Sequence, residues 1–259
     1  MTVNDGRVGG RERRAPSQPS SRLFEARTID DAPDLLEQSY ALRYQVYCLE
    51  RKFLRPEEYP RQLEMDEFDP HSIHVGALDM AGALAGTARA VKMSEAGLPL
   101  FGHCTIFPHE AAAHVGATLV EISRLAVSRM YNRRAPERRS GCGNVFLTLT
   151  KALYQATKRM GASYWLAATE PSLQRMLAQH GLPFRPIGPV SDYFGAVAPY
   201  RMSLAELDDL MLSNRFPVLQ DFVVGLEPGL GPRLDKPRSV APPARPRSDA
   251  RPPKQLGSL

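Results

Sequence analysis

The sequence lacks the features of a membrane-spanning or secreted protein. Its 259 residues contain no apolar run of about 18 residues, the length that a membrane-spanning helix needs. The N-terminus has no apolar segment of the kind found in secretory signals, and the three cysteines include no CxxC pair. Because unpaired cysteines are typical of a reducing compartment, we expect a cytoplasmic protein without a transmembrane segment.

Metal-binding motifs are missing as well. The histidines occur in neither an HExxH motif nor a closely spaced Cys/His pair. We therefore predict no metal site.

The positive charge lies at the two ends of the chain. Of the net charge of +5, residues 1–20 carry +2 and residues 233–259 carry +5, which leaves −2 for the part between them. Both ends are too poor in apolar residues to form a core, and the second is rich in proline. We predict a disordered segment over 1–20, one folded domain over 21–232 and a basic, Pro-rich disordered tail over 233–259. This distribution argues against nucleic-acid binding by the domain, although the tail allows weak contact with an anionic membrane surface.

Residues 118–127, TLVEISRLAV, predict a central strand that carries ionisable groups. Regular alternation places Glu121 and Ser123 on one face, and Arg124 on the other face with Val120 and Ile122. Burying a charge costs several kcal/mol unless it is paired. Glu121 and Arg124 should therefore have partners elsewhere in the chain.

Three segments offer such partners. A helix beginning near residue 31 and continuing to 53 has apolar residues at steps of three and four, and Arg43, Tyr47 and Arg51 share a second face of it. For Arg51 the pattern favours an ordinary exposed position, whereas Arg43 lies among residues expected to be buried. A Pro-punctuated loop over 55–70 contains Glu64, Asp66 and Asp69, and a predicted hairpin, 73–78 and 84–91, has Arg89 inside its second strand.

A glycine-rich turn follows the central strand and precedes a helix predicted over 145–160. Backbone N–H groups in such a turn, together with the positive end of the helix dipole, bind phosphate groups. The candidate residues are Arg138, Gly141, Cys142, Gly143 and Asn144. Alternatively, the glycines only form a tight turn.

The rest of the chain predicts a strand over 163–168, a helix over 171–180, strands over 184–190 and 194–203, and a helix over 204–212. The whole order indicates an α/β fold with a mixed sheet.

This layout resembles the GNAT (acyl-CoA N-acyltransferase) fold, a mixed, mostly antiparallel sheet flanked by helices, in which RxxGxG holds the phosphates of coenzyme A or of a carrier protein's phosphopantetheine. Four blocks, LRYQVY (42–47), EMDEFD (64–69), GTAR (86–89) and EISRLAV (121–127), resemble acyl-homoserine-lactone synthases. The later WLAATEPSLQRMLAQHGLPFRPIGP and PYR are more similar to long-chain N-acyl amino acid synthases and to acyltransferases associated with PEP-CTERM/exosortase systems. Lactone synthases have a tryptophan after the first block, where this chain has Leu54 and its neighbours, and the only tryptophan is Trp165.

The resemblance implies a neutral network of three arginines and three carboxylates at the active face: Arg43, Asp66, Asp69, Arg89, Glu121 and Arg124. It also implies an acyl donor, either acyl-CoA or the acyl-ACP thioester of an acyl carrier protein, with no tightly bound cofactor, and a small amine as acceptor. For this reaction we expect Glu121 to act as general base, assisted by Ser123. We expect Tyr47 and the other network residues to bind substrate, with Arg43 or Arg89 holding the carboxylate of an amino acid acceptor.

Three alternatives remain at this point. The chain is alternatively a CoA-dependent acetyltransferase of a small amine, an autoinducer synthase of the acyl-homoserine-lactone type, or a non-catalytic module in which the charges only fix a loop.

Overall fold

The computed structural model describes residues 23–112, 116–132, 145–193, 195–213 and 215–232. The predicted disordered ends and the glycine-rich turn at 138–144 lie outside these residues. Within the described residues, eight strands form one sheet in the order β1-β2-β3-β4-β5-β8-β6, with β7 paired to β8. The strands are β1 (Phe24–Thr28), β2 (Ser72–Asp79), β3 (Leu84–Lys92), β4 (Leu119–Val127), β5 (Tyr164–Thr169), β6 (Arg185–Pro186), β7 (Ser191–Asp192) and β8 (Ala196–Ser203). Every pairing is antiparallel except that of β4 with β5, so the predicted mixed, mostly antiparallel sheet is confirmed.

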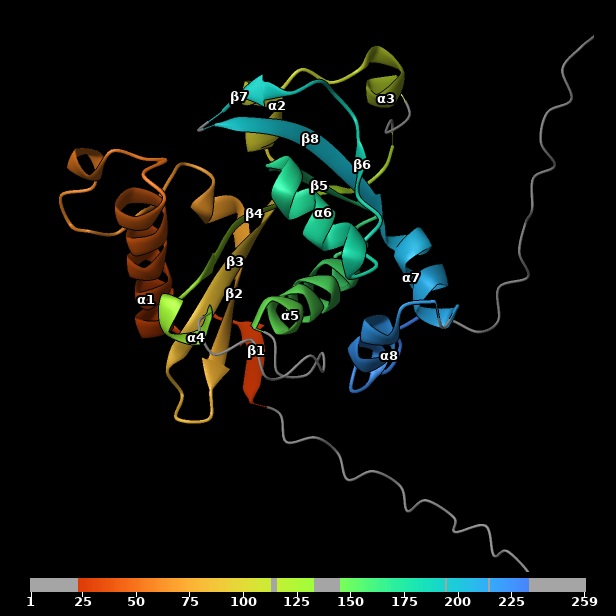
Figure 1. The fold of residues 1–259 in the computed structure, drawn as a ribbon, viewed down its shortest axis with the longest axis horizontal. Helices are drawn as coiled ribbons and strands as arrows, with labels where there is room; N and C mark the ends of the chain where they lie inside the picture. The colour runs from red at the N-terminus through yellow and green to blue at the C-terminus, as the bar shows by residue number, and fades with distance from the viewer. Residues whose placement is uncertain (1–22, 113–115, 133–144, 194, 214, 233–259) are drawn as a thin grey trace, which may run out of the picture.

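Helices cover both faces of this sheet. They are α1 (Pro33–Tyr44), which continues as a π-helix (Gln45–Glu50), α2 (Pro99–His103), α3 (Pro108–Ala112), α4 (Arg129–Asn132), α5 (Val145–Arg159), α6 (Pro171–Gln179), α7 (Leu204–Leu212) and α8 (Pro217–Val223). Figure 1 shows α1 and α5 on opposite sides of β2 and β3. Short 3-10 turns at Pro56–Glu58 and Asp69–His71 belong to the loop before β2.

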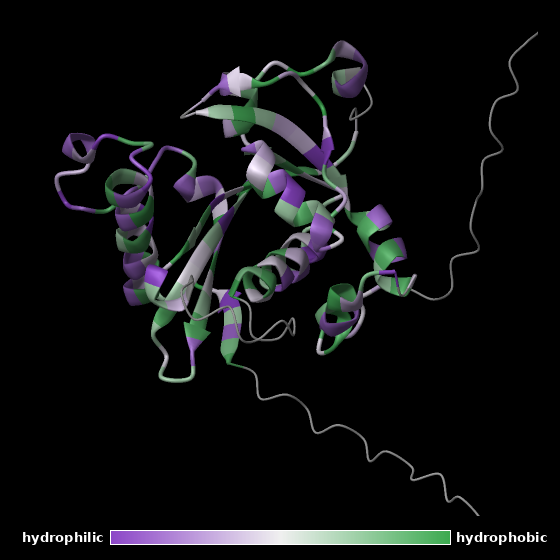
Figure 2. Ribbon diagram, in the orientation of Figure 1, coloured by the Kyte–Doolittle hydropathy of each residue, from purple (hydrophilic) through white to green (hydrophobic). Residues whose placement is uncertain are grey.

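The main core lies between α5 and the sheet. Ala88 and Ala90 of β3 face Leu149 and Leu153 of α5. A Cβ atom at Gly86 would lie 2.7 Å from a methyl carbon of Val145, so α5 approaches β3 closely because this position is glycine. Figure 2 shows mainly hydrophobic and neutral residues along β2 and β3, as expected for strands covered on both faces.

The helix that bears Arg43 departs from the predicted periodicity. The π-helix from Gln45 to Glu50 changes the rotation per residue, so Cys48 is buried while Leu49 is 52% exposed. Leu49, one of the apolar residues that recur at steps of three and four in this predicted helix, is therefore not part of its buried face. The N-cap is Ala32, followed by Pro33, so the helix begins close to the predicted start near residue 31.

Two further differences concern the C-terminal part. The predicted strand over 184–190 is reduced to the two residues of β6, and α8, which packs through Leu219 and Phe222, was not predicted. In the part of the chain that the structure describes, no helix has the length and apolar character needed to cross a membrane.

Candidate active site

Arg43, near the end of α1, lies in a buried cluster of ion pairs. Its Nε atom donates to Glu64 Oε2 at 2.5 Å, and its two Nη atoms donate to Asp69 at 2.7 and 3.1 Å. The side chains of Arg43, Glu64 and Asp69 are at most 2% exposed. A charged cluster at this depth is stable only because each ion has a bonded counter-ion.

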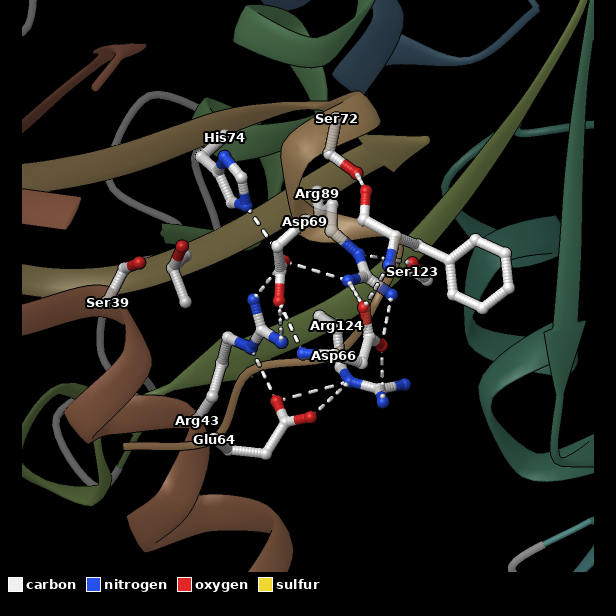
Figure 3. Close-up of polar contacts among 12 residues, drawn as sticks. Ser39, Arg43, Glu64, Asp66, Asp69, Ser72, His74, Arg89, Ser123 and Arg124 are labelled. Carbon is white, nitrogen blue, oxygen red and sulfur yellow. Dashed lines mark hydrogen bonds and ion pairs between the residues drawn. The ribbon is translucent and has the colours of Figure 1, made fainter. Parts of the chain in front are cut away.

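Arg89 and Arg124 complete the cluster. Arg89 donates to both oxygens of Asp66 at 2.5 and 2.9 Å, and to Asp69 at 2.8 Å. Arg124 donates to Glu64 at 3.1 Å and to Asp66 at 3.0 Å. Figure 3 shows the three carboxylates of the loop enclosed by the three guanidinium groups.

The predicted placement of Arg124 on the opposite face from Glu121 and Ser123 was wrong. Between the pairs Arg89–Ser123 and Thr87–Ala126 the register shifts, and Arg124 has a φ of 52°. This β-bulge turns Arg124 toward the same loop that Arg89 contacts. The left-handed backbone costs an arginine about 1–2 kcal/mol, which its two ion pairs offset.

The membership of the network also differs from the expectation. The third carboxylate is Glu64, which is fully buried, whereas Glu121 accepts a hydrogen bond of 2.7 Å from the backbone N–H of Leu100 in α2. Three arginines still balance three carboxylates. Glu121 is therefore the acid that stands beside the network without being one of its ion-pair partners.

His74 extends the network at its other end. Its Nε2 atom lies 2.9 Å from Asp69 and its Nδ1 atom 2.8 Å from Asp30. Burial lowers the pKa of His74, but the hydrogen bonds to Asp30 and Asp69 outweigh this effect and raise the pKa above its ordinary value. For Asp69, burial raises the pKa, and the hydrogen bonds from His74 and Arg43 lower it well below the usual range.

Glu121 has the opposite electrostatic environment. Its side chain is buried, and burial raises its pKa to about 7 against the opposing effects of the Leu100 hydrogen bond and of Arg89 and Arg124. Ser123, on the same face of β4, accepts a hydrogen bond of 3.2 Å from Arg89 Nε. A carboxyl group that titrates near neutral pH is suited to accept a proton from a substrate.

The sheet opens directly beyond Glu121. The parallel pairing of β4 with β5 covers only three positions and ends at the pair Glu121–Leu166, although both strands continue. A cavity of about 240 Å³ occupies the gap, and its lining includes Ile122, Ser123 and Arg124 on one side and Ala167 and Ala168 on the other. Backbone groups of the two diverging strands therefore border the cavity.

Polar and apolar residues both line the cavity. Glu121, Ser123, Arg124 and Tyr193 line it together with Val46, Phe53 and Leu54, and Tyr47 donates from its hydroxyl to Leu125 O at 2.8 Å. The lining from α5, β5, α6 and the residues after α6 is mainly apolar or aromatic, although it includes Thr150, Thr169 and Glu170, and we call it the apolar end: Phe146, Leu153, Trp165, Leu173, Leu177, Leu182 and Phe184. Such a shape fits a molecule with a reactive group at one end and a hydrocarbon chain at the other.

Residues 42–138 match the sequence model of the acetyltransferase (GNAT) domain family. This chain has the GNAT fold, and the match indicates an acyltransferase domain over residues 42–138. Many solved structures are similar to it, and three of them are FeeM, BjaI and TofI. FeeM, an N-acyl amino acid synthase from uncultured soil microbes, has 18% identity, a TM-score of 0.50 and coverage of 72% of this chain and 94% of FeeM.

The other two structures have a similar fold. BjaI, a CoA-dependent acyl-homoserine lactone synthase, has 20% identity and a TM-score of 0.54, over 77% of this chain and 98% of BjaI. TofI, in a ternary complex with an inhibitor and MTA, has 20% identity and a TM-score of 0.55, over 75% of this chain and 99% of TofI. At these identities the likeness concerns the fold. A comparison with curated protein sequences found no match.

Several features of this acyltransferase were not found from its sequence. Glu64 was noted only as part of an acidic loop, and Arg51, interpreted as an ordinary exposed residue, lines the cavity. The signal for Glu64 was present, because Arg124 needed a partner and Glu64 is one of the acids of the loop. No sequence pattern indicated the bulge at Arg124.

Proposed function

We propose that this protein is an N-acyltransferase that moves a long fatty acyl group from a thioester donor to the amine of an amino acid or similar small acceptor. The observation that supports the proposal is the cavity at the opening of β4 and β5, because the buried residue Glu121 and a mainly apolar surface both line it. The names of FeeM and BjaI, a synthase of N-acyl amino acids and a CoA-dependent synthase, support the reaction class.

The apolar end of the cavity is the proposed site of the acyl chain. Phe146, Leu153 and Trp165 provide surface from which a hydrocarbon chain displaces water, at about 0.8 kcal/mol for each buried methylene. The thioester then lies near Ser123 and Arg124, where the strands diverge. The binding of the donor's phosphates by the glycine-rich turn at 138–144 remains a prediction.

The proposed chemistry begins with the ammonium group of the acceptor. Glu121, directly or through a water molecule, takes one proton, and the free amine attacks the carbonyl carbon of the thioester. The new C–N bond forms a tetrahedral intermediate, whose oxyanion is stabilised by backbone N–H groups at the strand opening, at about 3 kcal/mol for one donor. The C–S bond then breaks, the nitrogen loses its second proton to solvent, and the thiolate leaves and is protonated.

In this scheme the ion-pair network is a positioning element. Arg89 joins Asp66 and Asp69 to Ser123, and Arg124 holds the bulged part of β4 against Glu64. The guanidinium groups of Arg43 and Arg89 are both bonded to carboxylates and both residues are 1% exposed, so they are poorly placed to bind a second carboxylate. The direct substrate contacts predicted for Tyr47, Asp66, Asp69 and Arg124 remain predictions.

Several finer assignments are part of this proposal. Acyl carrier protein is the proposed partner, because a long acyl chain is commonly delivered as its thioester, and coenzyme A is the other possible donor. Residues 21–232 are the proposed catalytic domain. A cytoplasmic location and a link to exosortase systems remain predictions from the sequence.

The experiment is an acyl-transfer assay with the purified full-length chain. Dodecanoyl-CoA and dodecanoyl acyl carrier protein are offered separately with a mixture of the standard amino acids, and products are identified by mass spectrometry. We expect N-dodecanoyl amino acids with at least one donor. Absence of any amide product with both donors would reject the proposal.

Acetyl transfer is the rival function, which the name of the matched domain family favours. Adding acetyl-CoA to the same assay in equal concentration separates the two. A long-chain enzyme gives mainly the dodecanoyl product, because an acetyl group leaves the apolar end of the cavity empty. A dominant acetylated product would favour the rival.

A further inference from the structure

Two arginines line the cavity in the described part of the chain, and they differ in how firmly they are bonded. The Arg124 side chain is 16% exposed and is paired with both Glu64 and Asp66. The Arg51 side chain is 55% exposed, and its ion pair with Glu170 has a distance of 3.5 Å between Nη2 and Oε2. Arg51 is therefore the cation at the cavity that an incoming anion can reach most easily.

The pair of Arg51 and Glu170 connects the two sides of the cavity. Arg51 directly follows the π-helix, Glu170 lies between β5 and α6, and both line the cavity. The Arg51 guanidinium also lies over the Phe53 ring, 5.2 Å from its centre. This cation–π contact orients the guanidinium and leaves its N–H groups available for hydrogen bonds. An exposed pair at this distance contributes at most about 1 kcal/mol, so it can exchange for a better partner.

We propose that Arg51 binds the carboxylate of the amino acid acceptor and thereby selects amino acids over simple amines. This inference rests on the proposed function, and it deepens it by assigning the acceptor class. Arg51 presents a planar fork of N–H donors that matches a carboxylate in a bidentate arrangement. Glu170 is the carboxylate that occupies this position when no acceptor is bound.

The placement of Arg51 explains how the two ends of an amino acid are distinguished. Arg51, Glu121 and Tyr47 all line the same cavity. In the proposed complex the acceptor's carboxylate meets Arg51 and its amine faces Glu121. The negatively charged Glu121 and Glu170 repel the acceptor carboxylate from other positions. Arg43 and Arg89 line no part of this cavity, which leaves Arg51 with the recognition role.

The test compares each standard amino acid with its own carboxamide as acceptor, using a dodecanoyl thioester as donor. The variants are Arg51→Met, which keeps the aliphatic stem, and Arg51→Lys, which keeps the charge. Arg55→Met is the matched control, since Arg55 is exposed, pairs with Glu58 and does not line the cavity. The readout is the kcat/KM for the amino acid divided by the kcat/KM for its carboxamide. The two acceptors differ in amine reactivity, but this difference is the same in every variant, so changes in the ratio between variants do not depend on it.

We expect Arg51→Met to lower this ratio about 10- to 100-fold through a higher KM for the acid, with the amide little affected. Arg51→Lys should recover part of the ratio, and Arg55→Met should leave it unchanged. Glu170→Gln should lower the KM for the acid, because it removes the competing carboxylate. A purely structural role of the pair would instead slow acid and amide equally in both variants.

The outcomes separate the two proposals. Acyl transfer with an unchanged acid-to-amide ratio in Arg51→Met would overturn the assignment of Arg51 while leaving the N-acyltransferase function in place. Absence of transfer by the wild-type chain to either acceptor would overturn the function itself, and the role of Arg51 with it.

Discussion

Glu121 accepts a 2.7 Å hydrogen bond from the backbone N–H of Leu100, and yet burial keeps the pKa of its carboxyl at about 7. One neutral donor does not replace the hydration that the carboxylate loses in a site where only 3% of the residue is exposed. The arginines nearby do not restore the usual pKa, because their charges are already balanced by Glu64, Asp66 and Asp69. The network thus leaves Glu121 able to take up a proton at neutral pH.

The first prediction concerns the pH dependence of acyl transfer. If ionised Glu121 is the base, kcat/KM rises with pH through about 7, the pKa of its carboxyl. Above that pH the carboxylate is fully ionised, and Glu121 causes no further rise. Glu121→Gln keeps the shape of the side chain but should lower the rate about 100- to 10,000-fold and remove this limb of the profile. The measurement is a pH profile of kcat/KM for both proteins.

The matched control for this prediction is Glu206→Gln. Glu206 lies on α7, where it forms an exposed ion pair with Arg185, and it does not line the cavity. Its profile should equal that of the wild type. A limb near pH 7 that persists in Glu121→Gln would assign the titration to another group.

A second prediction tests the energy of the buried network. Arg43→Met removes one cation and leaves Glu64 and Asp69 with one fewer partner each, in a site where both are buried. Breaking such a pair typically costs about 3–5 kcal/mol, because the remaining charge is not solvated. The free energy of unfolding, measured by urea denaturation, should fall by this amount.

Arg55→Met is the comparison here as well, since the Arg55–Glu58 pair is largely exposed and should be worth about 1 kcal/mol or less. Equal losses in the two variants would mean that the network of Arg43 contributes no more than a surface pair. The double variant Arg43→Met/Asp69→Asn should be less destabilised than the sum of its single changes, because the two residues contact each other.

The sequence predicted the sheet well because its strands are marked by local patterns. The hairpin of β2 and β3, the acid-bearing strand β4 and the helices α5, α6 and α7 all lie close to the expected positions. The demand that buried charges have partners also led to the right segments, since helix, loop and strands do bring Arg43, Asp66, Asp69, Arg89 and Arg124 together.

The sequence could not show which way the side chains point in two elements, the π-helix and β4. The π-helix after Tyr44 and the bulge at Arg124 each shift the side-chain pattern along their element. Arg124 faces the loop because Glu64 and Asp66 hold it there. Short helices such as α8 depend in the same way on packing, here of Leu219 and Phe222.

A third prediction follows from the raised pKa values of His74 and Glu121. A group whose pKa is higher in the folded state stabilises the protein below its unfolded-state pKa, and this stability is lost as the pH rises through the folded-state value. For Glu121 the loss runs from about 4.5 to about 7, and for His74 it begins near 6.5 and continues to its raised pKa. The free energy of unfolding should therefore decrease across this range.

Urea denaturation at a series of pH values checks this sign. In Glu121→Gln, the free energy of unfolding should decrease less steeply below about pH 7. In His74→Gln, it should decrease less steeply above about pH 6.5. Each variant should keep the contribution of the other group. If His74→Gln kept the full wild-type slope above that pH, the protonated state of His74 in the folded protein would be excluded.

The last prediction concerns the length of the acyl chain. Leu173 of α6 is half-buried and lines the apolar end of the cavity, so Leu173→Trp should fill part of that space without disturbing the main core. We expect the variant to lose kcat/KM progressively as the donor chain grows, about 10-fold or more for dodecanoyl thioesters, and to keep most of its activity with butanoyl donors, because each excluded methylene forfeits about 0.8 kcal/mol of burial. Leu210→Trp, at a half-buried position of α7 outside the cavity, controls for the effect of an added indole. An equal loss with short and long donors in Leu173→Trp would place the acyl chain elsewhere, since a filled channel must discriminate by length.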